Sequence, residues 1–185
     1  MREHGVLKRV LLVYREAIRR IEAQEELPPE PIHDGANVIR TFIEDYHERL
    51  EEDYLFPRFE KARRLADLTA VLRTQHQAGR RITDEILSLA NLTSLKDATG
   101  SRRLSEVMRQ FVRMYEPHEA REDTVLFPAL RGIISKQEFG ALGEDFEKKE
   151  HQLFGEGGFE KMVDRVAGIE KTLGIYDLAQ FTPKL

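Results

Sequence analysis

One segment of this chain occurs twice, and it restricts the fold more than any other feature. Residues 47–57 read His-Glu-Arg-Leu-Glu-Glu-Asp-Tyr-Leu-Phe-Pro, and residues 118–128 read His-Glu-Ala-Arg-Glu-Asp-Thr-Val-Leu-Phe-Pro. Both copies follow the pattern His-Glu-x-x-Glu-acidic-x-x-Leu-Phe-Pro. A lone histidine precedes each copy, His4 by 43 residues and His76 by 42 residues. The chain is therefore predicted to contain two copies of one helix pair.

Helices are expected to form the fold, because alternating β-branched runs and Asn-Gly turns are missing from the sequence. Apolar residues at helical spacing predict a first helix over Arg2–Glu26, a second helix capped at its N-terminus by Asp34, and a third helix from Asp67 to about Leu89. Pro57 should kink or end the second helix. The fourth helix is the most regular, and its a/d positions contain a histidine and a glutamate: Leu104, Met108, Phe111, Tyr115, His118, Glu122 and Val125.

The rest of the chain predicts a helical extension. One helix is expected after Gly132 to about Phe154, and another from Phe159 to about Leu173. The last apolar residues should dock on the bundle or on a partner, because exposing them to water is unfavourable; they are Ile175, Tyr176, Leu178 and Phe181. We therefore expect an all-α protein.

Its predicted architecture is a bundle of four helices over residues 1–134. A C-terminal helical extension over residues 135–185 should pack on that bundle.

Composition limits the chemistry and the location. The absence of cysteine excludes disulfides, thiolate zinc sites, iron–sulfur clusters and a catalytic thiol. With 29 basic and 33 acidic residues the net charge is −4, which provides no global field for nucleic acid. No apolar run approaches the roughly 20 residues of a membrane span, and no signal peptide is visible. We expect a cytoplasmic protein without nucleic-acid or membrane partners.

The repeated histidine–glutamate pairs indicate a metal site. A glutamate four residues after a histidine lies on the same helix face about one turn away. One such pair is usually a surface pair, but here there are two, each with a further histidine upstream. A buried carboxylate requires a partner, protonation or a metal. A metal would satisfy all six side chains together: His4, His47, Glu51, His76, His118 and Glu122.

The types of donor atom narrow the choice of metal. Nitrogen and carboxylate ligands without sulfur suit iron, manganese or zinc, and bridging carboxylates favour a pair of ions. Iron is preferred because di-iron sites with such ligands recur in helical bundles. Manganese and zinc remain alternatives, because residue spacing alone does not separate them from iron.

At these residues the chain resembles the hemerythrin-like, or HHE cation-binding, family. The resemblance covers about residues 1–131 and implies an up-down four-helix bundle around two oxo- or hydroxo-bridged iron ions. It also implies a role for each ligand: one iron is bound by His4 and His47, the other by His76 and His118, and both are bridged by Glu51 and Glu122.

The sequence departs from that pattern at one position. Oxygen-carrying members of the family use a fifth histidine one turn along the third helix, and here that residue is Arg80, which argues against simple oxygen carriage. Glu48 and Glu119, each next to a ligand histidine, resemble the extra carboxylates of iron-sensing members. His151 is a further candidate ligand if its helix caps the open end of the bundle. His33 is expected to be a capping or surface residue.

These inferences predict a hemerythrin-like di-iron protein that binds or senses dioxygen, nitric oxide, peroxide or iron itself. Two alternatives remain open: a di-iron peroxidase or catalase-like enzyme, and a metal-stabilised structural bundle. The expected partners are a small diatomic ligand or peroxide, together with a separate protein partner or a second copy of the chain.

Overall fold

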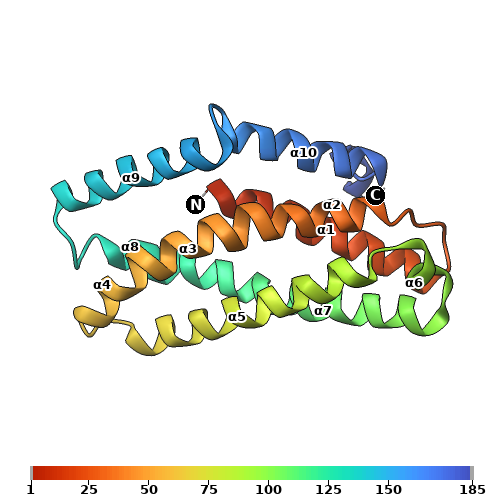
Figure 1. The fold of residues 1–185 in the computed structure, drawn as a ribbon, viewed down its shortest axis with the longest axis horizontal. Coiled ribbons are helices and arrows are strands. Elements are labelled where there is room, and N and C mark those ends of the chain that lie inside the picture. Colours follow the sequence, from red (N-terminus) through yellow and green to blue (C-terminus); the bar gives the residue numbers. More distant parts are fainter. Residues whose placement is uncertain (1, 184–185) are drawn as a thin grey trace.

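The computed structural model describes residues 2–183, and all regular structure within that range is helical, which confirms the all-α class. Four long helical segments alternate in direction and form an up-down bundle (Figure 1). They are α1 (Arg2–Ala23), the continuous segment containing α2 (Glu30–Val38), α3 (Glu48–Leu50) and α4 (Phe56–Lys61), α5 (Ala66–Leu89), and α7 (Ala98–Arg121) continued by α8 (Phe127–Leu130).

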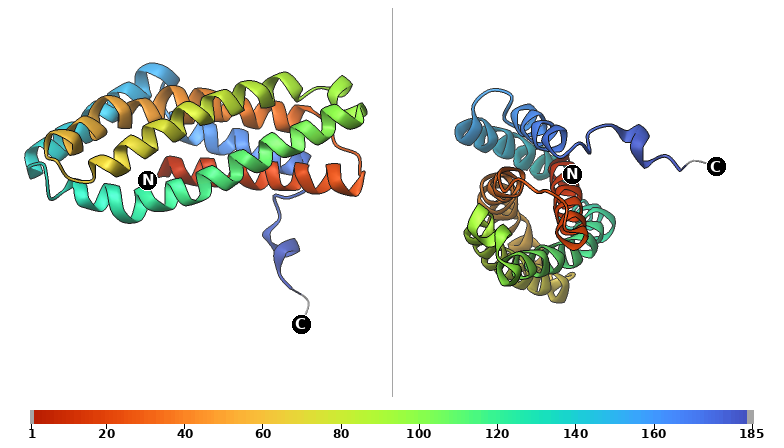
Figure 2. Two further views of the ribbon diagram at one scale, coloured as in Figure 1. Left: turned by 90° about the horizontal axis from the view of Figure 1, so that it is seen from below. Right: turned by 90° about the vertical axis from the view of Figure 1, so that its right-hand side faces the viewer.

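The four segments form a closed ring when the bundle is viewed end-on (Figure 2, right). Helix α1 packs against α2 and α7, and α5 packs against the same two helices from the other side. The short helix α6 (Leu92–Lys96) lies in the connection between α5 and α7. Two further helices, α9 (Lys136–Phe154) and α10 (Gly158–Thr172), lie outside the ring, where α10 packs on α1 and α2.

Two helix ends differ from the sequence prediction. The first helix ends at Ala23, three residues before the expected Glu26. The second begins at Glu30, so Asp34 lies inside it and is not its N-cap. The reason is Pro31, which is tolerated in a first helical turn because the amide that it lacks would have no partner there.

A π-helical turn in each copy of the repeat carries the helix past a proline. In the first copy, residues Glu51–Leu55 form this turn, and the amide of Phe56 donates to the carbonyl five residues earlier. Proline has no amide hydrogen, and its ring collides with the carbonyl four residues earlier in an α-helix. The wider turn relieves both problems, so Pro57 does not end the helix, which continues to Lys61. The second copy repeats this turn at Glu122–Leu126.

Two apolar clusters fill the bundle. The large apolar cluster contains, among others, Val10, Tyr14, Phe42, Ile86, Leu104 and Phe111. The small apolar cluster contains Leu55, Phe56, Phe59, Leu72, Leu126, Leu130 and Leu142. Along α5, for example, Leu72 belongs to the small cluster and Ile86 to the large one, while His76 lies between them. The predicted ligands therefore form a buried polar layer between two apolar clusters.

The C-terminal extension packs on the bundle, but its last residues do not. Leu142 of α9 and Val166 of α10 are buried in the small and large apolar clusters, respectively. Of the apolar tail, Ile175 alone is buried. Tyr176, Leu178 and Phe181 are exposed, and the tail extends away from the bundle (Figure 2, left). The expectation that these three residues dock on the bundle is therefore wrong, and docking on a partner stays a prediction.

None of the helices within residues 2–183 is both long enough and apolar enough to cross a membrane.

Candidate metal centre

The four predicted histidines lie inside the bundle as two pairs. His4 of α1 and His47 form the first pair, with their Nε2 atoms 3.0 Å apart. His76 of α5 and His118 of α7 form the second pair, with their Nε2 atoms 3.2 Å apart. Each is at most 4% exposed, so the pairs lie in the core rather than on the surface.

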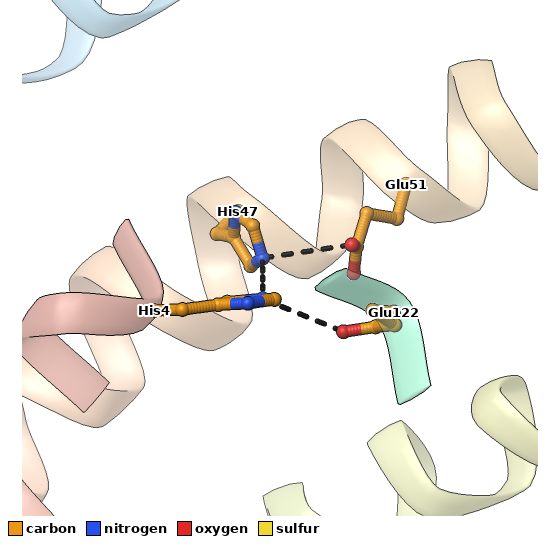
Figure 3. A group of neighbouring side chains, drawn as sticks. All are labelled: His4, His47, Glu51 and Glu122. Atoms are coloured by element: carbon orange, nitrogen blue, oxygen red, sulfur yellow. Dashed lines mark hydrogen bonds and ion pairs between the residues drawn. The ribbon is translucent and has the colours of Figure 1, made fainter. Parts of the chain in front are cut away.

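Glu51 connects the two pairs. Its Oε1 lies 3.5 Å from Nε2 of His47, and its Oε2 lies 3.5 Å from Nε2 of His76. The side chain thus faces one histidine of each pair, and Figure 3 shows it pointing toward the first pair.

Glu122 connects the pairs in the same way from the opposite copy of the repeat. Its Oε2 lies 3.4 Å from Nε2 of His4, and its Oε1 lies 3.1 Å from Nε2 of His118. His4, His47, Glu51 and Glu122 offer ligand atoms that all lie within 4.8 Å of one another, and so do His76, His118 and Glu122.

The outer nitrogens of three of these histidines are held by acceptors. Nδ1 of His4 lies 3.0 Å from Asp123 Oδ1, and Nδ1 of His76 lies 3.0 Å from Glu52 Oε1. A carboxylate can only accept, so the proton belongs on Nδ1, and Nε2 of the neutral ring presents a lone pair to the centre.

His118 is oriented similarly, because its Nδ1 lies 2.8 Å from the side-chain oxygen of Gln75. With the proton on the outer nitrogen of both His76 and His118, no proton lies between their facing Nε2 atoms. Two lone pairs 3.2 Å apart repel unless a cation lies close to both. The residues present therefore fit a bound metal.

The electrostatics of Glu51 and His47 support this fit. Both oxygens of Glu51 are buried and lack a hydrogen-bond partner within residues 2–183. Burial, followed by the nearby charge of Glu122, raises the pKa of Glu51 well above its usual range. Burial and the neighbouring His4 lower the pKa of His47 well below its usual range. A cation would stabilise the carboxylate and bind the neutral imidazole, which is the protonation state that a ligand histidine requires.

The roles of Asp123 and Glu52 were not predicted from the sequence, although the sequence carried a signal for them. Glu52 directly follows Glu51, and Asp123 directly follows Glu122. Each contacts the lone histidine that precedes the other copy of the repeat, so the acidic residue after the glutamate is the one that orients a histidine. Although burial opposes it, hydrogen bonds from His76 and Arg80 lower the pKa of Glu52 to about 2, which keeps it an acceptor.

Glu48 belongs to a third group of possible ligands, with Glu52 and His76, and it also contacts two residues outside the centre. The hydroxyl of Tyr115 donates to its Oε1 at 2.6 Å, and Nη2 of Arg80 lies 2.9 Å from its Oε2. Burial raises the pKa of Glu48 to about 8. Tyr115 reaches it across Gly79, where an added Cβ would overlap the tyrosine hydroxyl. The structure thus brings Glu48 beside the centre but engages it with a tyrosine and an arginine.

Glu119 occupies the equivalent position in the second copy. It is 3% exposed, and its Oε1 lies 3.9 Å from Nζ of Lys8. Burial raises the pKa of Glu119 to about 7. It belongs to none of the groups of possible ligands found among residues 2–183.

The two remaining histidines lie outside the centre. His151 is exposed on α9, beside Glu147 and Lys148, and it joins none of the ligand groups in the described part of the chain. His33 is exposed in α2, and its ring contacts the side chain of Asn37. The structure therefore does not bring His151 to the bundle core.

Four-helix bundles with histidines and carboxylates in the core form a recurring class of metal-binding proteins. The sequence matches the Hemerythrin HHE cation binding domain family over residues 1–101 and again over residues 84–185. The chain belongs to this family, as its resemblance at the repeated segment predicted.

Its relatives include uncharacterized proteins of Mycobacterium tuberculosis and Mycobacterium bovis. Each is 55% identical to this chain over 183 residues, which cover 99% of the chain and 72% of the relative. No solved structure matches the chain significantly.

Proposed function

We propose that the polar layer holds two iron ions, one at each histidine pair, and that Glu51 and Glu122 are shared between them. The observation that carries this proposal is the placement of the two carboxylates. Each presents one oxygen to a histidine of the first pair and the other oxygen to a histidine of the second pair. Manganese and zinc are the alternative metals, since the donors are nitrogen and oxygen only.

The donor count supports a role in binding small molecules. Two histidine nitrogens and two carboxylate oxygens would serve each ion, which leaves positions open if the ion is six-coordinate. Iron bound there would supply reversible electron transfer to a ligand. The protein would hold the imidazoles neutral and oriented through Asp123, Glu52 and Gln75, and its apolar clusters would limit access of water.

We therefore infer that the function is the binding or sensing of dioxygen, nitric oxide, peroxide or iron. Burial supports ligands of this size, because the six candidate ligands are all at most 4% exposed. A bulky substrate would have to displace the surrounding helices to reach them. Simple oxygen carriage is the disfavoured function, because Arg80 occupies the position at which oxygen-carrying members have a fifth histidine.

We also propose that residues 1–134 form the metal-binding bundle and that residues 135–185 form a C-terminal extension, of which helices α9 and α10 pack on the bundle. Support comes from contacts at both ends of α9. Leu142 is buried in the small apolar cluster. Near the other end, Glu150 accepts a hydrogen bond of 2.6 Å from Arg2, two residues before the candidate ligand His4.

The test is metal analysis and ultraviolet–visible spectroscopy of the full chain purified under oxygen. We expect two irons per chain and charge-transfer absorption in the wild-type protein. His118→Ala should lower the iron content by at least half, whereas the exposed-histidine control His151→Ala should retain it. Full iron content in His118→Ala, or iron-free wild-type protein after loading with ferrous iron, would contradict the proposal.

Additions of small molecules to the loaded protein separate the alternatives. A binding or sensing protein should change its spectrum with nitric oxide or dioxygen without consuming them. A peroxidase or catalase-like enzyme should consume peroxide at a rate proportional to its iron content. A metal-stabilised structural bundle should show no redox-dependent spectrum and should lose only thermal stability on chelation.

A further inference from the structure

An apolar cavity of about 610 Å³ lies between α8 and α9, and none of the six candidate metal ligands lines it. Helix α8 contributes Phe127 and Leu130 to its walls, and α9 contributes Leu142 and Phe146. These residues are three or four positions apart along their helices, so each helix turns one apolar face to the cavity. The volume lies within the range of small-molecule sites, roughly 300–1,000 Å³.

Gly143 and Phe139 show that the α9 wall of this cavity is open. Gly143 follows the buried Leu142, and a Cβ built on it would meet nothing within 4 Å. Phe139, one helical turn earlier, is 39% exposed although it lines the same cavity. A glycine and a phenylalanine ring are thus left uncovered on the face that α9 turns to the bundle. An apolar ligand would cover both.

The two ends of the cavity differ in charge. Asp123 lines the end nearer the metal centre, where its Oδ1 lies 3.0 Å from Nδ1 of His4. Arg131 lines the other end, eight residues later, which corresponds to roughly 12 Å along a helix. Its guanidinium carbon lies 5.0 Å from the centre of the Phe139 ring, and it forms no ion pair with any residue in the range 2–183.

A second hollow extends the basic end. It has a volume of about 450 Å³, shares Arg131 and Phe139 with the apolar cavity, and is also lined by Lys136. Lys136 is exposed, as Arg131 is, and it forms no ion pair within the part of the chain that the structure describes. Two cations without a carboxylate partner in that part of the chain therefore line the opening of an apolar space.

We propose that this cavity binds a carboxylate with an aliphatic chain, the chain lying between α8 and α9 and the carboxylate lying at Arg131 and Lys136. The apolar walls favour the chain, because burial of methylene groups is favourable. The two cations favour an anionic head group, and Asp123 at the other end repels it, so the charges determine which way the ligand lies. The inference goes beyond the proposed metal binding and does not depend on it.

The first experiment measures binding of dodecanoate to the full-length chain by isothermal titration calorimetry. Chelator is present throughout, so that the carboxylate cannot bind to a metal ion instead. The wild type should bind one dodecanoate saturably, at concentrations below those at which dodecanoate forms micelles. Shorter carboxylates should bind more weakly, by up to about fourfold for each methylene removed. Dodecyltrimethylammonium, which has the same chain and the opposite charge, should bind more weakly than dodecanoate.

Two glycines of α9 provide a matched pair of variants. Gly143→Leu places a side chain in the cavity and should abolish dodecanoate binding. Gly140→Leu places the same side chain in the same helix, at a position that does not line the cavity, and should retain binding. A Cβ is unhindered at both positions, and leucine has a higher helix propensity than glycine, so both variants should fold. Circular dichroism of both variants checks this.

A second pair of variants tests the charge at the opening. Arg131→Gln should weaken dodecanoate binding by up to about fivefold, which corresponds to the loss of an exposed ion pair. It should leave the binding of the uncharged dodecanol unchanged. Arg102→Gln changes an exposed arginine that does not line the cavity, and it should leave the binding of both compounds unchanged.

Several results would overturn the proposal. Absence of saturable dodecanoate binding to the wild type would do so, and so would equal binding to Gly143→Leu and Gly140→Leu. Equal affinities for dodecanoate and dodecyltrimethylammonium, or unchanged dodecanoate binding in Arg131→Gln, would show that the cavity does not select a carboxylate. Because all these measurements are made in chelator, their failure leaves the proposed metal centre standing. Iron-free protein in the metal analysis would, in turn, leave the cavity proposal standing.

Discussion

The large apolar cluster and the polar layer lie in the same four helical segments, yet they stabilise those segments by different means. In the large cluster, side chains such as Leu104 and Ile86 are fully buried, and burial alone favours the folded state. In the polar layer, Glu51 and Glu122 are also fully or almost fully buried, but burial of a carboxylate opposes folding unless a cation or proton compensates it.

This difference divides the stability of the bundle. The apolar cluster should hold the helices together whether or not metal is bound. The polar layer should contribute favourably only when its carboxylates and imidazoles have a cation to bind. Substitutions in the two regions should therefore respond differently to a chelator.

The largest expected effect is in the large apolar cluster. Leu104→Ala should lower the free energy of unfolding by about 2–5 kcal/mol, because it removes buried methyl groups and leaves a cavity. The loss should be the same in metal-loaded and chelated protein, as measured by urea denaturation. The exposed control Leu92→Ala should change the free energy of unfolding by less than about 0.5 kcal/mol. A loss from Leu104→Ala that disappears in chelator would mean that the two regions are not independent.

The second effect, that of Glu51→Gln on the free energy of unfolding, depends on whether metal is bound. Chelation should destabilise the wild type by about 1.4 kcal/mol for each of the two proposed ions, about 2.8 kcal/mol in all, if the free cation had been present at about 10 times its Kd. Glu51→Gln should lose most of this metal-dependent stabilisation, because an amide is a poorer bridging ligand. In chelator the same variant should be at least as stable as the wild type, because it removes an ionisable group whose pKa burial raises.

Urea denaturation with and without chelator, monitored by circular dichroism, measures both effects. The claimed difference between the polar layer and the large apolar cluster would be wrong if Glu51→Gln destabilised the chelated protein as strongly as the metal-loaded protein. That result would make Glu51 an ordinary packing residue of the core.

The sequence predicted the bundle and the inner residues of the site for the same physical reason. Helical periodicity determines which residues share a face, and the duplicated His-x-x-x-Glu turns place their side chains on the buried face of two helices. The spatial meeting of those two faces follows from the up-down arrangement, so His47 and Glu51 could be assigned to the same layer as His118 and Glu122.

Three features of the structure were not predictable from helical periodicity. The π-helical turn before Pro57 was missed, because an isolated proline usually signals a helix end. The orienting contacts of Glu52 and Asp123 depend on how the helices are rotated relative to one another, which local periodicity does not specify. The exposed tail at Leu178 and Phe181 shows the same limit, since apolar residues alone do not say what, if anything, covers them.

The smallest effect in this comparison is at the boundary between the two regions. Gly79→Ala would place a Cβ where the hydroxyl of Tyr115 now lies, and 2.8 Å from its ring carbon Cζ. The tyrosine must shift, which should cost about 1–3 kcal/mol of unfolding free energy and break its hydrogen bond to Glu48.

Gly140→Ala is the matched control, because a Cβ on this α9 glycine meets nothing within 4 Å. It should stabilise the protein by up to about 1 kcal/mol through helix propensity alone. Tyrosine absorbance and urea denaturation of both variants measure the outcome. If Gly79→Ala were as stable as Gly140→Ala and left the tyrosine spectrum unchanged, Tyr115 would have room to move without cost. The polar layer would then be less rigidly joined to the large apolar cluster than the packing at Gly79 indicates, and the two regions would be more independent than the shared helices suggest.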